Sequence, residues 1–598
     1  MKRFFKILCV AIVASFIFNA CQKNIEGDST IIDPVLPPVA SDITTKITAT
    51  LVSGFVTDGN DVAVKDASVE VGTKTMLTDK YGYFEIRNVQ VVQYAAMVTV
   101  NKTGFFKGIK TYIATANKAA FFRIKLIPKI VAGTVNAATG GTVIVSGGLL
   151  ISFPANAIVN ASTNVAYTGT VNVSAYKIDP TSIDLPRIMP GDLRGLNTDS
   201  QLQLLTSYGM AAVELTGAGA ELLQIATGKK ATMTMPIPPT IIATAPATIP
   251  LWYFDETIGL WKQEGSATKT GNNYVGDVSH FSFWNYDVPA NYVQFNCTVV
   301  NTAGAPVQNA YVKVSLLSNP NNAGFGYTDS AGYTGGAVPN NAQLKLQVYA
   351  NALCTGMAAY TQNFTTTNVN ISLGSLVVNT STSVSNLTGS VKNCAGTPVT
   401  NGYIIIQDGN IYSRTALTNT GTYSVNKLFC SYPAQVNLIG EDITNLQQNL
   451  PISYTVTTAG INNIPAITAC GVNTQQFINY SINSTSYNLT APIDSLYSNN
   501  YQISRRVQGY RASTPPSYLI FDFDNNALAV GSNNVLMKIS SNQISDTTTF
   551  NSPILVHITE YGAIGQFVAG NFAGVVNGGS QGNIIYNITC NFRVRRNN

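Results

Sequence analysis

The sequence is 598 residues long, with 11% charged residues, 10% aromatic residues and a formal net charge of +5. Lys2, Arg3 and Lys6 account for three of these positive charges, so the rest of the chain carries +2, too weak a field to indicate nucleic-acid binding. Many Tyr, Thr, Asn, Val and Ile among few charges are typical of β-rich exported proteins, and the length allows about four or five domains.

Residues 1–20 are predicted to be a secretory signal peptide. A basic start precedes an apolar run over 7–18, which is too short to span a bilayer of about 30 Å, and Asn19 and Ala20 then lead to Cys21. Residues 18–21 resemble the lipobox of bacterial lipoproteins, although Phe18 stands where Leu is usual. The resemblance implies that the Cys21 thiol is acylated, and each buried CH₂ of the acyl chains contributes about 0.8 kcal/mol of membrane binding. The alternative is an ordinary cleaved signal that ends near a cysteine.

Residues 21–46 are predicted to be a lipid-anchored linker. They have no hydrophobic period, and Pro34, Pro37 and Pro38 stiffen them locally. Residues 22–28 resemble the tether of surface-exported lipoproteins of the Bacteroidetes, which implies display on the outside of the outer membrane. No later stretch is apolar for long enough to form a second membrane span.

One pattern then occurs three times along the chain. A turn precedes each copy, and the first two copies alternate apolar and other residues, as half-buried strands do. The copies are residues 64–71, 307–314 and 399–406. A second turn follows each of them, in which Asp79, Asp329 and Asn419 are predicted to cap the turn while a nearby glycine takes a positive φ.

These repeated residues resemble the carboxypeptidase regulatory-like domain, a transthyretin-like β-sandwich of about seven strands. The resemblance covers residues 47–129, 291–378 and, in degenerate form, 379–475. The family is an accessory fold found beside peptidases and in surface-display proteins. It therefore implies location and fold, and no catalytic residues.

Residues 130–290 have a different pattern, which includes an alternating strand at 231–236 and an aromatic segment at 251–256. The segment resembles the ZU-type β-sandwich of ankyrins, netrin receptors and cartilage intermediate layer proteins, which implies a packing and interaction module. It holds all three tryptophans, Trp252, Trp261 and Trp284. Their aromatic faces suit a sugar-stacking platform, but Trp252 and Trp261 flank a predicted hairpin, where a packed cross-strand pair is the simpler interpretation.

Residues 476–598 are predicted to be a C-terminal β domain of antiparallel strands joined by glycine turns. The segment resembles C-terminal domains of Bacteroidetes lipoproteins. Its last basic residues, Arg593, Arg595 and Arg596, are interpreted as a charged strand edge in preference to a binding patch.

Six cysteines follow Cys21, and an even number in an exported protein suggests disulfides. They are Cys297, Cys354, Cys394, Cys430, Cys470 and Cys590. Six cysteines allow 15 connectivities. We expect Cys297 to pair with Cys354, and Cys394 to pair with either Cys430 or Cys470. None has the spacing of a zinc site.

Groups that could carry catalysis are sparse. The two histidines, His280 and His557, lie far apart and are expected to be packed strand residues. The adjacent carboxylates Asp255 and Glu256 fall at a predicted turn tip, which favours a solvated turn. Asp522 and its neighbours open like a calcium loop but lack the turn glycine and the closing glutamate. We therefore predict no catalytic residues, no metal and no cofactor.

Together these features predict an all-β protein of tandem β-sandwich modules behind a lipoprotein signal peptide and a short linker. The predicted function is a non-catalytic cell-envelope protein for surface binding, adhesion or structure. Its expected partners are the membrane, through the acyl chains, and glycans or other surface proteins, without nucleic acid. The alternatives are a carbohydrate-binding lipoprotein of a glycan-uptake system, and an enzyme of unfamiliar chemistry, which would need a histidine beside a carboxylate in a cleft.

Overall fold

The computed structural model describes most of the chain after residue 42. The described ranges are 43–354, 358–379, 384–491, 494–501, 503–511, 517–526, 528–544, 549–562, 567–578 and 584–596. Within them the fold is all-β, as predicted, with a single four-residue α-helix, α2 (Leu185–Ile188), and the short 3-10 helix η2 (Ile242–Thr244). No helix in this part of the chain is long and apolar enough to cross a membrane. The signal peptide, Cys21 and nearly all of the linker lie outside the described residues.

The first module, residues 46–125, is a sandwich of two sheets with strand orders β4-β1-β7 and β3-β2-β5-β6. Strand β1 pairs antiparallel with β4 and parallel with β7. Every second residue of β2 and β5, such as Val69 and Val98, is buried between the sheets because side chains alternate along a strand. The strands are β1 (Lys46–Thr57), β2 (Ser68–Val71), β3 (Lys74–Leu77), β4 (Tyr83–Val92), β5 (Ala96–Asn101), β6 (Gly108–Tyr112) and β7 (Ala119–Lys125).

The third and fourth modules repeat this topology. In the third, residues 292–378, the sheets are β24-β21-β27 and β23-β22-β25-β26, and β21 and β27 are again parallel. In the fourth, residues 384–473, β28 lies between β31 and the parallel strands β35 and β36, opposite a sheet built on β29 and β32. The strands of the third module are β21 (Tyr292–Asn301), β22 (Tyr311–Leu316), β23 (Ala323–Tyr327), β24 (Tyr333–Pro339), β25 (Gln343–Tyr349), β26 (Tyr360–Thr365) and β27 (Ile371–Val378). Those of the fourth are β28 (Val384–Asn393), β29 (Gly402–Asp408), β30 (Ile411–Ala416), β31 (Thr422–Leu428), β32 (Ala434–Asp442), β33 (Gln447–Gln448), β34 (Ile452–Val456), β35 (Gly460–Asn463), β36 (Ile467–Ala469) and β37 (Val472–Asn473).

The second repeated turn is capped by a side chain in all three of these modules. Asp79 Oδ1 accepts the backbone N–H groups of Tyr81 and Tyr83 at 2.8 and 2.9 Å, and Asp329 does the same in the third module. In the fourth module the cap is Thr418, whose Oγ1 accepts two backbone N–H groups. The prediction that Asn419 caps this turn was wrong by one residue, because the glycine with positive φ, Gly421, lies three residues after Thr418.

The second module, residues 131–290, is a folded sheet of 13 strands. Its interior is the largest apolar cluster described, and β14 runs through the middle of it. The strands are β8 (Val131–Asn136), β9 (Gly141–Ile144), β10 (Leu150–Phe153), β11 (Ile158–Asn160), β12 (Thr170–Ile178), β13 (Arg194–Leu196), β14 (Leu202–Thr216), β15 (Leu222–Ile225), β16 (Ala231–Pro236), β17 (Thr248–Asp255), β18 (Leu260–Thr270), β19 (Asn273–Val278) and β20 (Phe283–Ala290).

The fifth module, residues 477–595, is one sheet in the order β39-β38-β46-β45-β44-β43-β42-β41-β40. The sheet curls around a core that contains Phe521, Phe523 and Phe592, so its two end regions approach each other, with a bridge between Ser498 and Arg596. The strands are β38 (Phe477–Ile482), β39 (Thr485–Thr490), β40 (Ser495–Tyr501), β41 (Ser504–Arg511), β42 (Ser517–Asp524), β43 (Asn533–Ser541), β44 (Leu555–Tyr561), β45 (Phe567–Gly578) and β46 (Ile584–Arg595).

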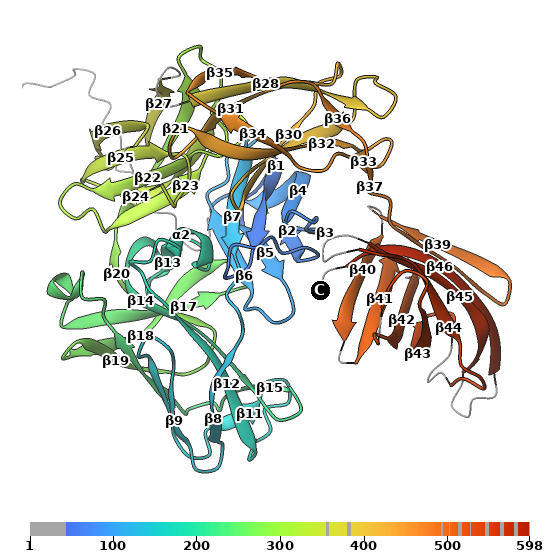
Figure 1. The fold of residues 1–598 in the computed structure, drawn as a ribbon. Coiled ribbons are helices and arrows are strands. Elements are labelled where there is room, and N and C mark those ends of the chain that lie inside the picture. Colours follow the sequence, from blue (N-terminus) through green and yellow to red (C-terminus); the bar gives the residue numbers. More distant parts are fainter. Residues whose placement is uncertain are drawn as a thin grey trace, which may run out of the picture.

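The modules form a cluster around the first one, where the sequence alone suggested a row. Figure 1 shows the first module (blue) at the centre, with the second below it, the third and fourth above it and the fifth at its side. Lys125 Nζ lies 2.8 Å from Asp184 of the second module. The guanidinium of Arg123 stacks near the ring of Tyr327 in the third module and donates to the Tyr412 carbonyl of the fourth. The first module therefore contacts the second, third and fourth modules through residues of β7.

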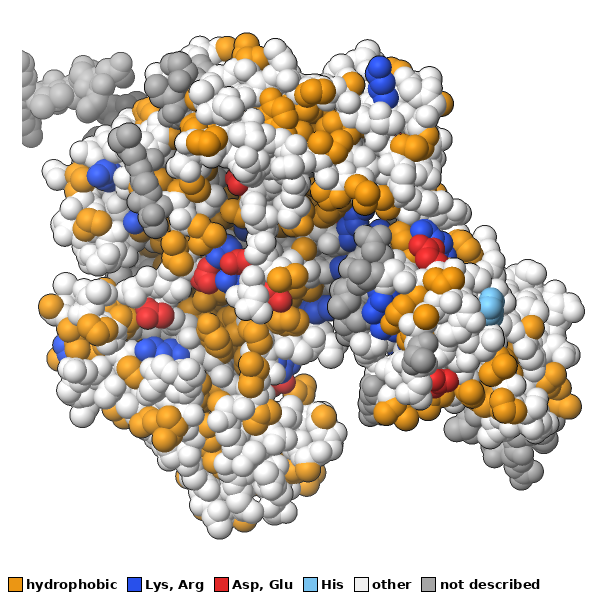
Figure 2. All heavy atoms as spheres, viewed as in Figure 1, with side chains coloured by type: hydrophobic (Ala, Val, Ile, Leu, Met, Phe, Trp, Pro, Cys, Tyr) orange, Lys and Arg blue, Asp and Glu red, His pale blue; other side chains and the backbone are white. Residues whose placement is uncertain are grey.

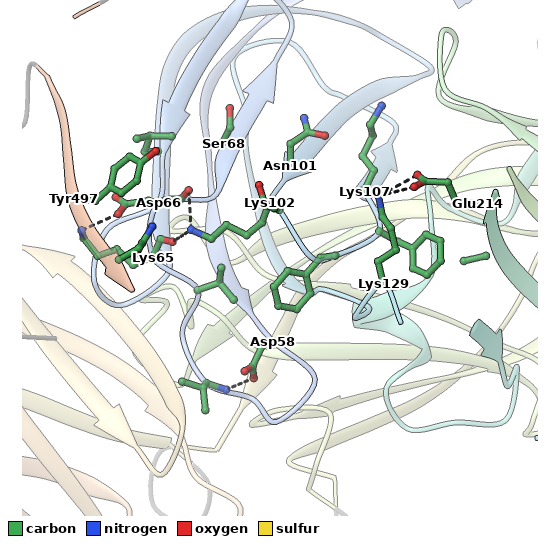
Figure 3. Close-up of a pocket in the computed structure, with 18 of the residues that line it drawn as sticks. Asp58, Lys65, Asp66, Ser68, Asn101, Lys102, Lys107, Lys129, Glu214 and Tyr497 are labelled. Carbon is green, nitrogen blue, oxygen red and sulfur yellow. Dashed lines mark hydrogen bonds and ion pairs between the residues drawn. The ribbon is translucent and has the colours of Figure 1, made fainter. Parts of the chain in front are cut away.

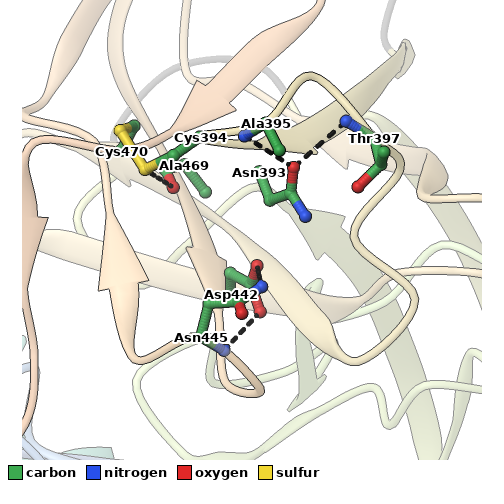
Figure 4. Close-up of a disulfide and its surroundings, with 8 residues drawn as sticks. All are labelled: Asn393, Cys394, Ala395, Thr397, Asp442, Asn445, Ala469 and Cys470. Carbon is green, nitrogen blue, oxygen red and sulfur yellow. Dashed lines mark hydrogen bonds between the residues drawn. A yellow bond between two sulfur atoms is a disulfide. The ribbon is translucent and has the colours of Figure 1, made fainter.

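Two disulfides reinforce the third and fourth modules. Cys354 bonds to Cys430 and so joins the third module to the fourth, while Cys394 bonds to Cys470 within the fourth. Figure 4 shows the second bridge beside the turn that Asn393 caps. The Cys394–Cys470 bond is one of the two pairings that the sequence left open for Cys394.

The expected bond between Cys297 and Cys354 is not formed. Cys297 points into the core of the third module from β21, with 1% of its surface exposed, whereas Cys354 lies in a loop after β25 that meets the fourth module. Cys590 is likewise a buried thiol, in β46. Cys354 is bonded to Cys430, so it does not pair with Cys297.

Candidate functional site

The three tryptophans do not form a platform, because each is 0% exposed. Their indole N–H groups donate to backbone carbonyls: Trp252 to Asp287, Trp261 to Asp192 and Trp284 to His280. A face that stacks on sugar must be open to solvent. The sugar-stacking hypothesis for these residues is therefore wrong, and they are packed in the second module.

Strand register explains why Trp252 and Trp261 do not face each other directly across the hairpin. Trp261 lies across from Phe254, with ring centroids 5.3 Å apart, and Trp252 lies across from Gln263. A bulge between Pro250 and Trp252 shifts this register. The two tryptophans are therefore not a direct cross-strand pair, although both are in the same apolar cluster.

The histidines occupy two unrelated places. The His280 ring packs edge-on against Tyr253 at 4.6 Å, its Nε2 lies 3.8 Å from Glu264, and burial lowers the pKa of this histidine. His557 lies exposed on the outer face of β44, where its Nδ1 is 3.0 Å from Asn533 Oδ1, so the expectation that it is packed was wrong. Neither histidine lies in the wall of the large cleft described next.

The candidate site is a cleft of about 1450 Å³ between the first, second and fifth modules, to which the fourth contributes Asn410 and Tyr412. Figure 2 shows Lys and Arg side chains gathered in the hollow between the fifth module and the first. The first module supplies the turn from Asp58 to Asp66 and the loop from Asn101 to Lys107. The fifth module faces them with β40 and β41, from which Tyr497 and Arg506 enter the wall.

Several cations of the cleft are held by carboxylates. Lys129 Nζ lies 3.0 Å from both oxygens of Glu214, which joins the first module to the second (Figure 3). Lys107 forms an ion pair with Glu256 at the tip of the β17–β18 turn. That turn is therefore docked on the first module, in contrast to the freely solvated turn predicted for Asp255 and Glu256. These two pairs connect the first module to the second and engage two of the five carboxylates in the cleft wall.

Other cations in the wall donate to neutral oxygens. Lys102 Nζ lies 2.9 Å from the Lys65 carbonyl and 3.3 Å from the Asp66 carbonyl. Lys80 donates to Gln448 Oε1 of the fourth module. Arg596 donates to the Gly562 carbonyl, and its guanidinium lies 4.1 Å from the ring centre of Tyr561. Positive charge therefore concentrates where the first and fifth modules meet.

Burial is the main influence on the protonation of these cations. Burial, followed by the charge of Arg595, lowers the pKa of Lys80 to about 8. Burial also lowers the pKa of Lys65 and of Lys102. Across the cleft, burial and then the Asp66 charge raise the pKa of Tyr497. A lowered lysine pKa means that the surroundings disfavour its positive charge, which nearby negative charge would reverse.

The C-terminal arginines have a different place from the one predicted. Arg595 is 6% exposed, its guanidinium lies 4.5 Å from the ring centre of Phe567, and it lines the cleft together with Arg596. Arg593 forms an ion pair with Glu560 at 2.6 Å. Because β46 lies between β38 and β45, the prediction that these arginines mark a charged sheet edge was wrong. The cleft itself had no signature in the sequence, because its walls come from turns and strand ends of four modules.

This chain is similar to known proteins only over a short segment or at low sequence identity. No protein-family model matches the sequence. Cartilage intermediate layer protein 2 of Mus musculus is 31% identical over 106 residues, which is 18% of this chain. The chain spans only 9% of the length of that relative.

Solved structures with some similarity to this chain include pilins, at low sequence identity and low TM-score. The shaft pilin SpaA of Lactobacillus rhamnosus GG is 11% identical, with 30% of this chain and 98% of that chain covered and a TM-score of 0.17. BcpA, the major pilin subunit of Bacillus cereus, is 9% identical, with 70% and 99% covered and a TM-score of 0.12. We draw no functional assignment from these likenesses.

Proposed function

We propose that this chain is a non-catalytic protein of the bacterial cell surface, held on the outer membrane through Cys21, which binds a ligand in the cleft between its modules. The main observation that supports this proposal is the cleft. Its walls are turns and strand ends held by rigid β-sandwiches, which is the arrangement in which binding residues usually occur. Adhesion and envelope structure are roles that such a surface protein would serve through this ligand.

The chemistry of the cleft favours binding over catalysis. Proton transfer needs an acid or base that is within reach of a substrate and able to exchange its proton. Glu214 and Glu256 are each engaged by a lysine, and the two histidines lie elsewhere. The enzyme hypothesis needed a histidine beside a carboxylate in a cleft, and His280 meets Glu264 outside this one.

A blocking substitution tests the cleft as the binding site. Asn101 is exposed at the end of β5 and belongs to the cleft wall (Figure 3). The purified full chain should bind components of a glycan array, and Asn101→Trp, which fills the space, should abolish that binding. Asn101→Ala is the matched control and should retain it. Equal binding by both variants would place the ligand outside the cleft.

Cell fractionation tests the anchor. Wild type should be recovered in the membrane fraction, whereas Cys21→Ser, which cannot be acylated at this position, should leave it. If the variant stays in the membrane fraction as wild type does, lipid at Cys21 is not what holds the protein.

Carbohydrate binding for glycan uptake is the second candidate, and one observation favours it. The cleft wall carries amide and hydroxyl groups, such as those of Ser68, Asn499 and Gln508, beside the ring of Tyr497. These groups both donate and accept hydrogen bonds, as sugar hydroxyls require. The proposed carbohydrate site is therefore the cleft and not the buried tryptophans.

A further inference from the structure

The cleft has an excess of positive charge. Its wall contains eight Lys or Arg residues and five Asp or Glu residues. The cations are Lys65, Lys80, Lys102, Lys107, Lys129, Arg506, Arg595 and Arg596, and the carboxylates are Asp58, Asp61, Asp66, Glu214 and Glu256. This local excess contrasts with the small net charge of the whole chain, so the cations are gathered at this place.

The excess lies between the first and fifth modules. Lys107 and Lys129 are neutralised on the side of the second module, by Glu256 and Glu214. On the other side, Lys65 pairs with Asp66, and Arg506 pairs with Asp522. Lys80 and Lys102 donate instead to neutral oxygens. An ammonium has three N–H donors, and the bond to Gln448 uses one of those on Lys80. These side chains can therefore accept an anionic partner without losing an ion pair.

The rest of the wall suits a sugar more than a denser polyanion. Neutral hydrogen-bonding side chains line it throughout: Ser68, Asn101, Thr103, Asn410, Ser495, Asn499, Asn500 and Gln508. Aromatic rings stand among them, including those of Tyr497 and Tyr501. A nucleic acid carries a charge every 1.7 Å or so along its duplex, and the cleft's carboxylates would repel so dense a charge. A saccharide chain presents hydroxyls between well-spaced acidic groups.

We propose that the cleft binds a saccharide chain that carries carboxylate or sulfate groups. The acidic groups lie beside Lys80 and Lys102, and the sugar hydroxyls bond to the amides of Asn101 and Gln508. Burial lowers the pKa of Lys80 and of Lys102, and a bound anion would raise both pKa values again. The inference rests on the proposed function, since it names the ligand class of the same cleft.

Calorimetry on the purified full chain tests the class. The ligands are hexasaccharides of galacturonate, which carries carboxylates, of kappa-carrageenan, which carries sulfates and no carboxylates, and of maltose units, which are neutral. At least one acidic hexasaccharide should bind roughly tenfold or more tightly than the neutral one, and its affinity should fall as salt rises from about 50 mM to about 500 mM. The stronger of the two acidic ligands identifies the source of the charge.

Charge-removing variants locate the contact. Lys80→Gln and Lys102→Gln should each weaken acidic binding roughly tenfold, the loss expected for one charge-assisted hydrogen bond. Lys102→Arg keeps the charge and should retain binding. Lys74→Gln is the matched control, because Lys74 is an exposed lysine of the same module outside the cleft, and it should bind as wild type. Thermal unfolding confirms that each variant is folded.

The outcomes separate this inference from the proposed function. If the neutral hexasaccharide binds as tightly and Asn101→Trp blocks it, the acidic class is wrong and the cleft remains the site. If no saccharide binds, both proposals fall. If an oligonucleotide or a poly-glutamate peptide of equal charge binds more tightly than the acidic sugars, the ligand is a different macromolecule and the inference is overturned.

Discussion

Arg414 of the fourth module reaches Asp79 of the first, with Nη1 3.0 Å from Oδ2. The other oxygen of Asp79 caps the repeated turn, so one carboxylate both closes a turn and joins two modules. Arg414 also bonds to Glu441 at 3.1 Å and lies 3.7 Å from the ring centre of Tyr403. The repeated turn of the first module therefore also forms part of the contact with the fourth module.

Removal of this arginine should destabilise the protein. Arg414→Ala leaves Asp79 and Glu441 without their shared counter-charge in a half-buried place, and we expect a loss of about 2 kcal/mol, less than for a fully buried pair because Asp79 is partly exposed. Denaturant unfolding measures it. Arg87→Ala is the control, since Arg87 is 60% exposed in its pair with Glu85 and should matter little. Equal losses in the two variants would contradict the prediction.

The two disulfides allow a comparison at constant loop length, because each closes a separation of 76 residues. The entropy of the unfolded chain predicts a loss of about 4.5 kcal/mol for either bridge. The double variants Cys354→Ser with Cys430→Ser, and Cys394→Ser with Cys470→Ser, should therefore unfold at similarly reduced denaturant concentrations. Losses below about 1 kcal/mol in both would show that loop closure is not how these bonds stabilise the protein.

Local signals in the sequence predicted the β-sandwiches. The contacts between modules could not be predicted from these signals. The turns at Asp79 and Asp329 follow from residue type and spacing alone. Thr418 was missed because a threonine replaces the acid and Asn419 next to it imitates the cap. The partner of Cys354 could not be found in this way, since the bond depends on how the third and fourth modules dock. The cleft escaped prediction for the same reason.

Replacement of a buried tryptophan should reduce stability and leave ligand binding alone. Trp252→Ala removes a fully buried indole and its hydrogen bond to the Asp287 carbonyl, so we expect a loss of about 4 kcal/mol by denaturant unfolding. Trp252→Phe, which keeps most of the volume, should lose less. The folded fraction of either variant should bind saccharide as wild type does. Weaker saccharide binding by a folded variant would show that the tryptophans contribute to the binding site.

The two free thiols among the described residues, Cys297 and Cys590, should be unreactive in the native protein. Burial raises the pKa of Cys297 to about 12, and burial also raises that of Cys590. The thiolate is the reactive form, so iodoacetamide near pH 8 should leave both residues unlabelled, as read by peptide mass spectrometry. Unfolding in denaturant should expose both to labelling. Native labelling of either would show that its strand opens readily.

Lys110 should make stability rise with pH above neutrality. Its Nζ donates to the carbonyls of Pro186 and Met189 between the first and second modules, and burial lowers its pKa to about 7 from an unfolded value of 10.5. Between these values the unfolded chain binds more protons than the folded one, so the free energy of unfolding increases with pH. Below about pH 7 both states are protonated and the cost of burying the charge is fully present.

The variant Lys110→Met isolates this contribution. The stability of wild type relative to this variant should increase as pH rises from about 7 to about 10, in denaturant unfolding measured at half-unit steps. Lys74→Met provides the control, because Lys74 is exposed and its replacement should leave the pH profile unchanged. A difference between wild type and Lys110→Met that stays constant over this range would mean that Lys110 keeps its proton when it is buried. In that case the two carbonyls alone would compensate for the loss of solvent around the ammonium.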